Sequence, residues 1–253
     1  MTRLARAVQD FLERRLLAEC IDDLPLTAEQ RNARKADYLL LDRSVIVELK
    51  DLVDDRLAPI KAVIDRWRDR PDWPPVYGAP GIQEVLRVHP EGRQINEELV
   101  LPILKSLESI LRSANQQIRT TRETFVVDDA HGVLFLVNDA VDLLDPEVLG
   151  LTLFRLLTKR TRDGALRFPD IDSAIVFSTA HDAVDAEGVR HHAIYSVYRP
   201  EVYPRGVEGS FDEFVFEQWA SFLKLPFDRS LVIGSADELK SLRFVGKRPP
   251  PEI

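Results

Sequence analysis

The sequence predicts an α/β fold with one mixed β-sheet flanked by helices. Segments whose apolar residues recur at helical spacing alternate along the chain with short runs rich in Leu, Val and Ile, an alternation typical of this class. The 253 residues are 45% hydrophobic, which is enough to fill one large core. There is no internal repeat and no low-complexity block, so we expect a single domain over residues 1–253.

In the N-terminal half, two helical patterns surround a pair of short strands. Periodic apolar residues predict a helix over 4–19. Two short apolar runs, 36–42 and 45–50, predict strands that are joined by a tight turn. Helical spacing returns over 51–70 and is longest over 95–123. The order is therefore helix, two strands, helices.

In the C-terminal half, a strand buried on both faces comes first. Residues 133–137 are continuously apolar, as in a central strand. Asp145 at the N-cap and Pro146 at the first helical position predict the start of a helix. We expect two further strands, which form a hairpin, and a last helix: 173–180, 190–200 and 211–224.

Composition and charge exclude several classes of protein. The formal net charge of -8 argues against a protein that coats nucleic acid by charge alone. It leaves a nuclease open, because metal ions can reverse the sign of an acidic site. The single cysteine, Cys20, excludes an intramolecular disulfide. We expect a cytoplasmic protein without a membrane partner, because the sequence shows neither the apolar run of a signal peptide nor that of a membrane span.

Three ionisable residues, Asp37, Glu48 and Lys50, interrupt the two apolar strands. If a two-residue loop at 43–44 joins the strands, Asp37 lies opposite Lys50, and Glu48 lies opposite Leu39. Because side chains alternate along a strand, the three groups then converge on one face of the hairpin, within about 5–8 Å of one another. A loop of odd length would break this arrangement.

Two interpretations of these groups are open. Burying a charge without compensation costs several kcal/mol, so the three groups need one another or a metal ion. They form either an ion pair that fixes the strand register or a site in which Asp37 and Glu48 bind a divalent cation. Oxygen ligands suit Mg²⁺ or Mn²⁺, which would polarise a phosphodiester and lower the pKa of a bound water. Lys50 would then orient the water or neutralise charge on the phosphate.

The spacing of these residues, "AD" followed ten residues later by "VELK", resembles the signature of the PD-(D/E)xK phosphodiesterases, the restriction-endonuclease-like superfamily. The resemblance implies that Asp37 and Glu48 are acidic metal ligands, that the backbone carbonyl of Leu49 also contacts the metal, and that Lys50 is the catalytic lysine. Ala36 stands where the family's short name has proline.

The resemblance also implies residues on two helices. Many members place a glutamine on the helix after the lysine strand. Gln116 and Gln117 are both available, and Gln117 lies beside the apolar stripe of its helix, which makes it the better candidate. Some members use a glutamate from the first helix, where Glu13 and Glu19 both fit.

The order of elements is similar to that of the family core over residues 1–140. On this basis, 55–95 is an insertion after the lysine strand and 145–253 is a C-terminal extension. The resemblance implies a metal-dependent nuclease that hydrolyses phosphodiester bonds in DNA, with Mg²⁺ or Mn²⁺ as cofactor and a homodimer by analogy. Its catalytic residues would be Asp37, Glu48, Lys50 and Gln117. The alternative is an inactive relative that acts as a binding or assembly module, which the acidic charge favours.

Several other features have a functional and a plain structural interpretation. His191 and His192 are neighbours on a predicted strand and point to opposite faces, so they do not share a metal. The stretch 66–70, with Trp67 and Trp73 nearby, could bind or stack on nucleic acid or form a solvated helix face. Further basic residues could line a nucleic-acid path: Arg112, Arg119, Arg122 and the stretch 158–162.

Overall fold

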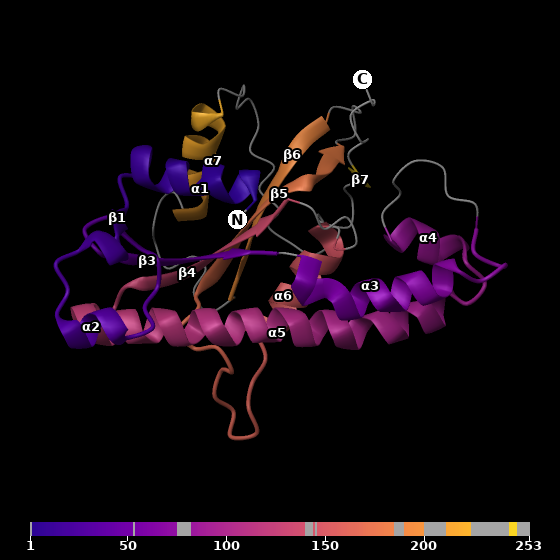
Figure 1. Ribbon diagram of the computed structural model, residues 1–253, viewed down its shortest axis with the longest axis horizontal. Helices are drawn as coiled ribbons and strands as arrows, with labels where there is room; N and C mark the ends of the chain where they lie inside the picture. The colour runs from indigo at the N-terminus through magenta and orange to yellow at the C-terminus, as the bar shows by residue number, and fades with distance from the viewer. Residues whose placement is uncertain are drawn as a thin grey trace.

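The described residues form one mixed β-sheet with helices on both faces (Figure 1). This computed structural model describes residues 2–52, 54–74, 82–139, 144, 146–184, 190–199, 211–223 and 243–246. The helices are α1 (Arg3–Arg14), the 3₁₀ helix η1 (Ile21–Asp23), α2 (Ala28–Asn32), α3 (Asp54–Arg68), α4 (Ile82–Val88), α5 (Gly92–Phe125), α6 (Pro146–Leu157) and α7 (Phe211–Phe222). The strands are β1 (Glu19–Cys20), β2 (Tyr38–Leu40), β3 (Val45–Asp51), β4 (His131–Asn138), β5 (Ser173–Val184), β6 (Arg190–Tyr198) and β7 (Arg243–Gly246).

The strand order in the sheet is β1-β2-β3-β4-β5-β6, and β7 pairs with β5 beside this path. β2 and β3 form an antiparallel hairpin, whereas β3, β4 and β5 run parallel. The chain crosses from β3 to β4 through α3, α4 and the long α5, as a parallel pair requires. β5 and β6 form the antiparallel hairpin that the sequence predicts. The predicted α/β class with a mixed sheet is therefore confirmed.

Each face of the sheet is covered by a different set of helices. α1 and α7 lie on one face, where Phe11 meets Trp219 with ring centroids 5.0 Å apart (Figure 1). α5 crosses the other face and packs its apolar stripe against Leu39 and Ile46. Because both faces are covered, the middle of β4, residues 133–137, is apolar and buried, as its sequence predicts. The hairpin β2–β3 lies between these two layers.

The turn of this hairpin differs from the prediction. Leu40 pairs with Val45, so four residues, 41–44, form the turn instead of two. Leu41, Asp42 and Arg43 all have positive φ, although none of them is glycine. The Ser44 backbone N–H closes the turn by donating to the Leu41 carbonyl at 3.0 Å. The register is therefore shifted by two residues, and the prediction that Asp37 faces Lys50 was wrong.

An even shift leaves the assignment of faces intact, because side chains alternate with period two. Tyr38 and Leu40 contact the α1 side of the sheet, while Leu39 contacts the α5 side, as predicted. Tyr38 pairs with Val47, which places Asp37, the preceding residue, beside Glu48. The Asp37 backbone N–H donates to the Val47 carbonyl at 3.2 Å and extends the ladder by one bond.

The other long helices and strands agree with the predicted ones to within a few residues, except that the first helix ends at Arg14 instead of 19 and Glu19 lies in β1. The short elements β1, η1, α2, α4 and β7 were not predicted. The long helix covers 92–125 instead of 95–123, and α3, inside the predicted insertion, packs along it. Pro146 opens α6 as expected, whereas Asp145 lies outside the described residues. Among the helices of the described ranges, none combines the length and the hydropathy that a membrane crossing needs.

Candidate active site

Four of the residues singled out by sequence lie together at the open end of the β2–β3 hairpin, on the α5 side of the sheet. Asp37 precedes β2, Glu48 and Lys50 lie on β3, and Gln117 reaches them from α5. The Lys50 ammonium contacts Glu48 Oε1 and donates to Gln117 Oε1 at 3.1 Å. Glu48 is completely buried, and the Lys50 side chain is 17% exposed. We call these four residues the carboxyl-pair site.

Asp37 is fixed by the backbone of the strand opposite it. Its Oδ2 accepts a hydrogen bond of 2.7 Å from the Leu49 backbone N–H. The N–H and C=O of one strand residue point to the same edge of the strand. The Leu49 carbonyl therefore lies on the edge of β3 that faces Asp37, where the family resemblance expects a backbone metal ligand.

The two carboxyl groups are poorly compensated. Burial and the nearby Asp37 raise the pKa of Glu48 to about 8, although Lys50 and Arg34 lower it in part. Burial also raises the pKa of Asp37, which the Leu49 amide, Lys50 and a hydrogen bond with the Glu48 side chain lower in part. Glu48 Oε2 is buried and has no hydrogen-bond partner in the described structure. One lysine thus serves a fully buried acid, Glu48, and a partly buried one, Asp37, which leaves the pair with affinity for a proton or a cation.

α5 holds this end of the hairpin through one face of the helix. Ser113, Gln117 and Thr121 are four residues apart and so share that face. Gln117 accepts from Ser113 Oγ at 2.9 Å and donates from Nε2 to the Lys35 carbonyl at 2.8 Å. Thr121 Oγ1 accepts from the Ala36 backbone N–H at 2.8 Å. Sequence reasoning missed Ser113 and Thr121, which the four-residue spacing from Gln117 could have indicated.

The other glutamine candidate lies outside the site. Gln116 is exposed and donates to Thr120 Oγ1 at 3.2 Å on the outer face of α5. Gln117, by contrast, is only 8% exposed and contacts Lys50 directly. The preference for Gln117, which rested on its position beside the apolar stripe, agrees with this placement.

Neither glutamate proposed from the first helix joins the site. Glu13 accepts from the Tyr38 hydroxyl at 3.0 Å, on the opposite face of the sheet. Glu19 lies at the turn end of the hairpin, where it pairs with Arg43 at 2.8 Å. The acid that does influence the site is Asp22 of η1, which contributes to the raised pKa of Asp37. Sequence reasoning missed Asp22, because it lies in a segment interpreted as a connection.

The nearby tryptophans are engaged within the protein. Trp67 is 3% exposed and donates from Nε1 to Glu98 at 2.9 Å. Trp73 packs against His89 with ring centroids 5.6 Å apart. The hypothesis that Trp67 and Trp73 stack on nucleic acid is therefore wrong for Trp67, whose ring is enclosed. The side chains of His191 and His192 lie outside the described part of the structure.

The donor set at the site fits a hard divalent cation. Asp37, Glu48 and the Leu49 carbonyl offer only oxygen atoms, and the unpartnered Glu48 Oε2 is free to coordinate. No group of three or more His, Cys, Asp or Glu side chains with metal-binding geometry occurs among the described residues, so backbone, substrate or water oxygens would complete the shell. Comparisons with protein-family models, curated proteins and solved structures found no match.

Proposed function

We propose that this protein is a metal-dependent nuclease with a restriction-endonuclease-like fold, which hydrolyses phosphodiester bonds in DNA. The observation that carries the proposal is the carboxyl pair: Asp37 and Glu48 are neighbours across one hairpin, and Glu48 Oε2 is buried without a partner. The order of helix, hairpin, long helix and parallel strand supports it, because the resemblance in sequence implies the same order.

The chain's own residues divide the chemistry between them. Asp37, Glu48 and the Leu49 carbonyl would hold Mg²⁺ or Mn²⁺, which supplies Lewis acidity and a water of lowered pKa. Lys50 is fixed between Glu48 and Gln117, so its ammonium stands beside the carboxyl pair. There it can orient the attacking water or neutralise charge that develops on the phosphate. Gln117 positions Lys50 and ties α5 to the segment before Asp37.

The second candidate is a binding or assembly module without catalysis. The direct Lys50–Glu48 ion pair favours it, because this contact neutralises Glu48 in part without any metal. A buried pair of this kind is common in purely structural settings. The expected homodimer stays a prediction, to be checked by the mass of the protein in solution.

Metal binding separates the two candidates without a guess at the substrate. Calorimetric titration of Mn²⁺ into the wild type should show saturable binding, and Glu48→Ala should lose it. Glu19→Ala is the matched control, because it removes a carboxylate from the turn end of the same hairpin. Binding that survives Glu48→Ala would contradict the site.

Cleavage tests the chemistry itself. Single-stranded and duplex DNA are incubated with the protein and Mn²⁺, and the products are separated by electrophoresis. Asp37→Asn should abolish cleavage. Lys50→Met should lower the rate by about 100-fold or more while Mn²⁺ binding persists, because the lysine acts on the phosphate or the water. Equal cleavage by wild type and Lys50→Met would exclude Lys50 from the reaction.

A further inference from the structure

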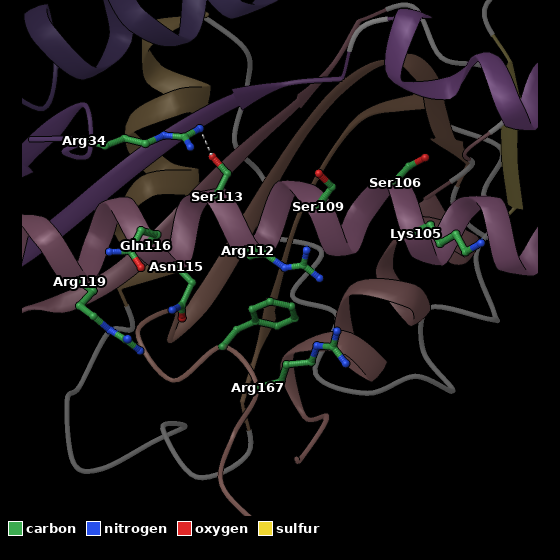
Figure 2. Close-up of a pocket in the computed structure, with 11 residues that line it drawn as sticks. Arg34, Lys105, Ser106, Ser109, Arg112, Ser113, Asn115, Gln116, Arg119 and Arg167 are labelled. Carbon is green, nitrogen blue, oxygen red and sulfur yellow. Dashed lines mark hydrogen bonds between the residues drawn. The ribbon is translucent and has the colours of Figure 1, made fainter. Parts of the chain in front are cut away.

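A basic groove of about 960 Å³ runs along the outer face of α5, next to the carboxyl-pair site (Figure 2). Five cationic side chains line it, together with serines and amides: Arg34, Lys105, Arg112, Arg119 and Arg167. None of the described residues that line it is acidic. In a chain whose formal net charge is -8, such a concentration of positive charge needs a reason.

Three of these cations have no carboxylate partner. Lys105 and Arg112 are exposed, and neither forms an ion pair or a hydrogen bond within the described ranges. Arg34 donates to the Ser113 hydroxyl, not to an acid. Arg119 and Arg167, by contrast, pair with Asp170 and Glu108 outside the groove lining. Uncompensated charge in a concave surface attracts anions.

The groove has the form of a track. Its exposed α5 residues recur every three or four positions, so they form one stripe on the helix: Lys105, Ser109, Arg112, Gln116 and Arg119. At 1.5 Å per residue, Lys105 and Arg119 are about 21 Å apart along the axis. Phosphates of one DNA strand repeat at about 3.4 Å along a duplex, so several fit along this length.

The middle of the track, at Ser113, is connected to the carboxyl-pair site. Arg34 donates to Ser113 Oγ at 2.8 Å (Figure 2). Ser113 in turn donates to Gln117 Oε1 at 2.9 Å. Gln117 Oε1 also accepts from Lys50 at 3.1 Å. A ligand held at Arg34 is thus three hydrogen bonds away from the lysine that is proposed to act on the phosphate.

We propose that this groove binds the sugar–phosphate backbone of a single nucleic-acid strand and leads it to the carboxyl-pair site. The lining offers cations, hydroxyls and amides, which are the groups that contact phosphate and sugar. Its volume is comparable to that of a small-molecule site, so it has room for consecutive nucleotides of one strand. The role of the bound strand as substrate rests on the proposed nuclease function, whereas binding itself does not.

The test measures binding without metal, so that cleavage plays no part. A fluorescein-labelled single-stranded oligothymidylate is titrated with the full chain in EDTA and followed by fluorescence polarisation. The double variant Lys105→Glu/Arg112→Glu should bind at least about tenfold more weakly. Arg14→Glu/Arg93→Glu carries the same change of net charge on two exposed arginines outside the groove and should bind like wild type.

The salt dependence gives a second readout with milder variants. Lys105→Ala/Arg112→Ala removes two cations that would each neutralise a phosphate. The slope of log K against log salt should therefore become shallower by about 1.4 for a single strand. The proposal is overturned if the wild type does not bind the single strand or binds duplex as tightly. It is also overturned if both charge-reversed double variants lose the same amount of affinity for the strand. Unchanged thermal unfolding of the variants shows that folding is intact.

The two proposals fail in different ways. Binding that depends on the groove, in a protein that neither binds Mn²⁺ nor cleaves DNA, supports the groove and removes the nuclease. Mn²⁺-dependent cleavage that the groove variants leave unchanged, with unchanged binding, overturns the groove and keeps the nuclease.

Discussion

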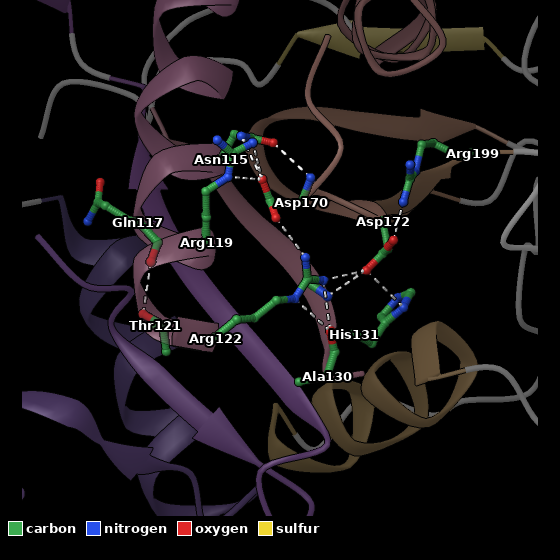
Figure 3. A network of polar contacts seen from close by, with 11 residues as sticks. Asn115, Gln117, Arg119, Thr121, Arg122, Ala130, His131, Asp170, Asp172 and Arg199 are labelled. Atoms are coloured by element: carbon green, nitrogen blue, oxygen red, sulfur yellow. Dashed lines mark hydrogen bonds and ion pairs between the residues drawn. The ribbon is translucent and has the colours of Figure 1, made fainter. Parts of the chain in front are cut away.

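Two buried ionic clusters contact α5, and they differ in how their carboxylates are compensated. The first is the carboxyl-pair site. The second, which we call the arginine network, lies where the C-terminal part of α5 meets the starts of β4 and β5 (Figure 3). Its charged members are Arg119, Arg122, Asp170, Asp172 and Arg199.

In the arginine network, each carboxylate oxygen has a guanidinium partner. Arg122 donates to Asp170 Oδ1 at 2.9 Å and to Asp172 Oδ2 at 3.1 Å. Arg199 contacts the other oxygen of Asp172, and Arg119 that of Asp170. Three cations thus serve two acids, whereas the carboxyl-pair site has one lysine for two acids.

The difference indicates a structural role for the arginine network and a ligand-binding role for the carboxyl-pair site. A cluster in which every carboxylate oxygen has a guanidinium partner can be explained by structure alone. A cluster with an unpartnered buried oxygen costs stability, and such a cost is typical of functional sites. This contrast favours a ligand at Asp37 and Glu48 over a purely structural ion pair.

The largest expected effect is in the arginine network. Arg122→Ala should lower the free energy of unfolding by about 3–5 kcal/mol, because it leaves two buried carboxylates without their shared partner. Urea unfolding measures the loss. Arg119→Ala is the control and should cost below about 1 kcal/mol, since Arg119 is 44% exposed and Asp170 keeps Arg122. Equal losses in the two variants would contradict the central role of Arg122 in the network.

Asp212 is a buried carboxylate outside both clusters, so it tests how burial alone affects stability. Burial raises the pKa of Asp212, in the first turn of α7, to about 6, and a hydrogen bond with Ser196 offsets part of this. A raised folded pKa means that stability is present at low pH and is lost as the pH rises from the unfolded value of 3.8 through about 6.

Asp212→Asn should remove this dependence, since the amide stays neutral. At about pH 4 the variant should be as stable as wild type, and at about pH 8 it should be more stable by on the order of 2 kcal/mol. Urea unfolding of both proteins across this range measures the difference. A difference that does not change with pH would contradict a raised pKa at Asp212.

The smallest expected effect is a change in the free energy of unfolding at the carboxyl-pair site, and its sign distinguishes a ligand site from a structural ion cluster. Asp37→Asn should stabilise the metal-free protein by about 1 kcal/mol, because it relieves repulsion with Glu48 and its amide oxygen still accepts from the Leu49 N–H. The same change in the network, Asp172→Asn, should destabilise, because Arg122 and Arg199 lose their acid. Unfolding is measured in EDTA. A loss in both variants would make the carboxyl-pair site a structural ion cluster.

The sequence predicted the elements around the site well because their signals are local. Side chains alternate between the faces of a strand, which assigned Leu39 and Tyr38 to opposite faces. The assignment is correct although the predicted register was wrong, because the register differs by two residues and such a shift leaves every side chain on its face. Helical periodicity placed Gln117 on the buried side of α5. The register was missed because Leu41, Asp42 and Arg43 carry no glycine to indicate a turn with positive φ.

Contacts between segments that are distant in the chain could not be predicted from sequence patterns. Asp22 and Glu13 are equally acidic, and only the packing of η1 against the end of β2 and of α1 on the far face decides which one lies near Asp37. Three arginines on α5 look alike in sequence, yet Arg112 faces the groove, Arg122 is partly buried in the network, and Arg119 contributes to both.

By itself, the sequence determined the longer helices and strands, the faces of the hairpin and the grouping of Asp37, Glu48 and Lys50, because each follows from short-range periodicity. The tertiary structure alone decided that Asp37 faces Glu48, that Gln117 reaches Lys50 across 67 positions of chain, and that Arg122 joins Asp170. These contacts depend on how the turn closes and on which side of α5 meets the sheet. Both are set by the packing of the whole core, which no local pattern encodes.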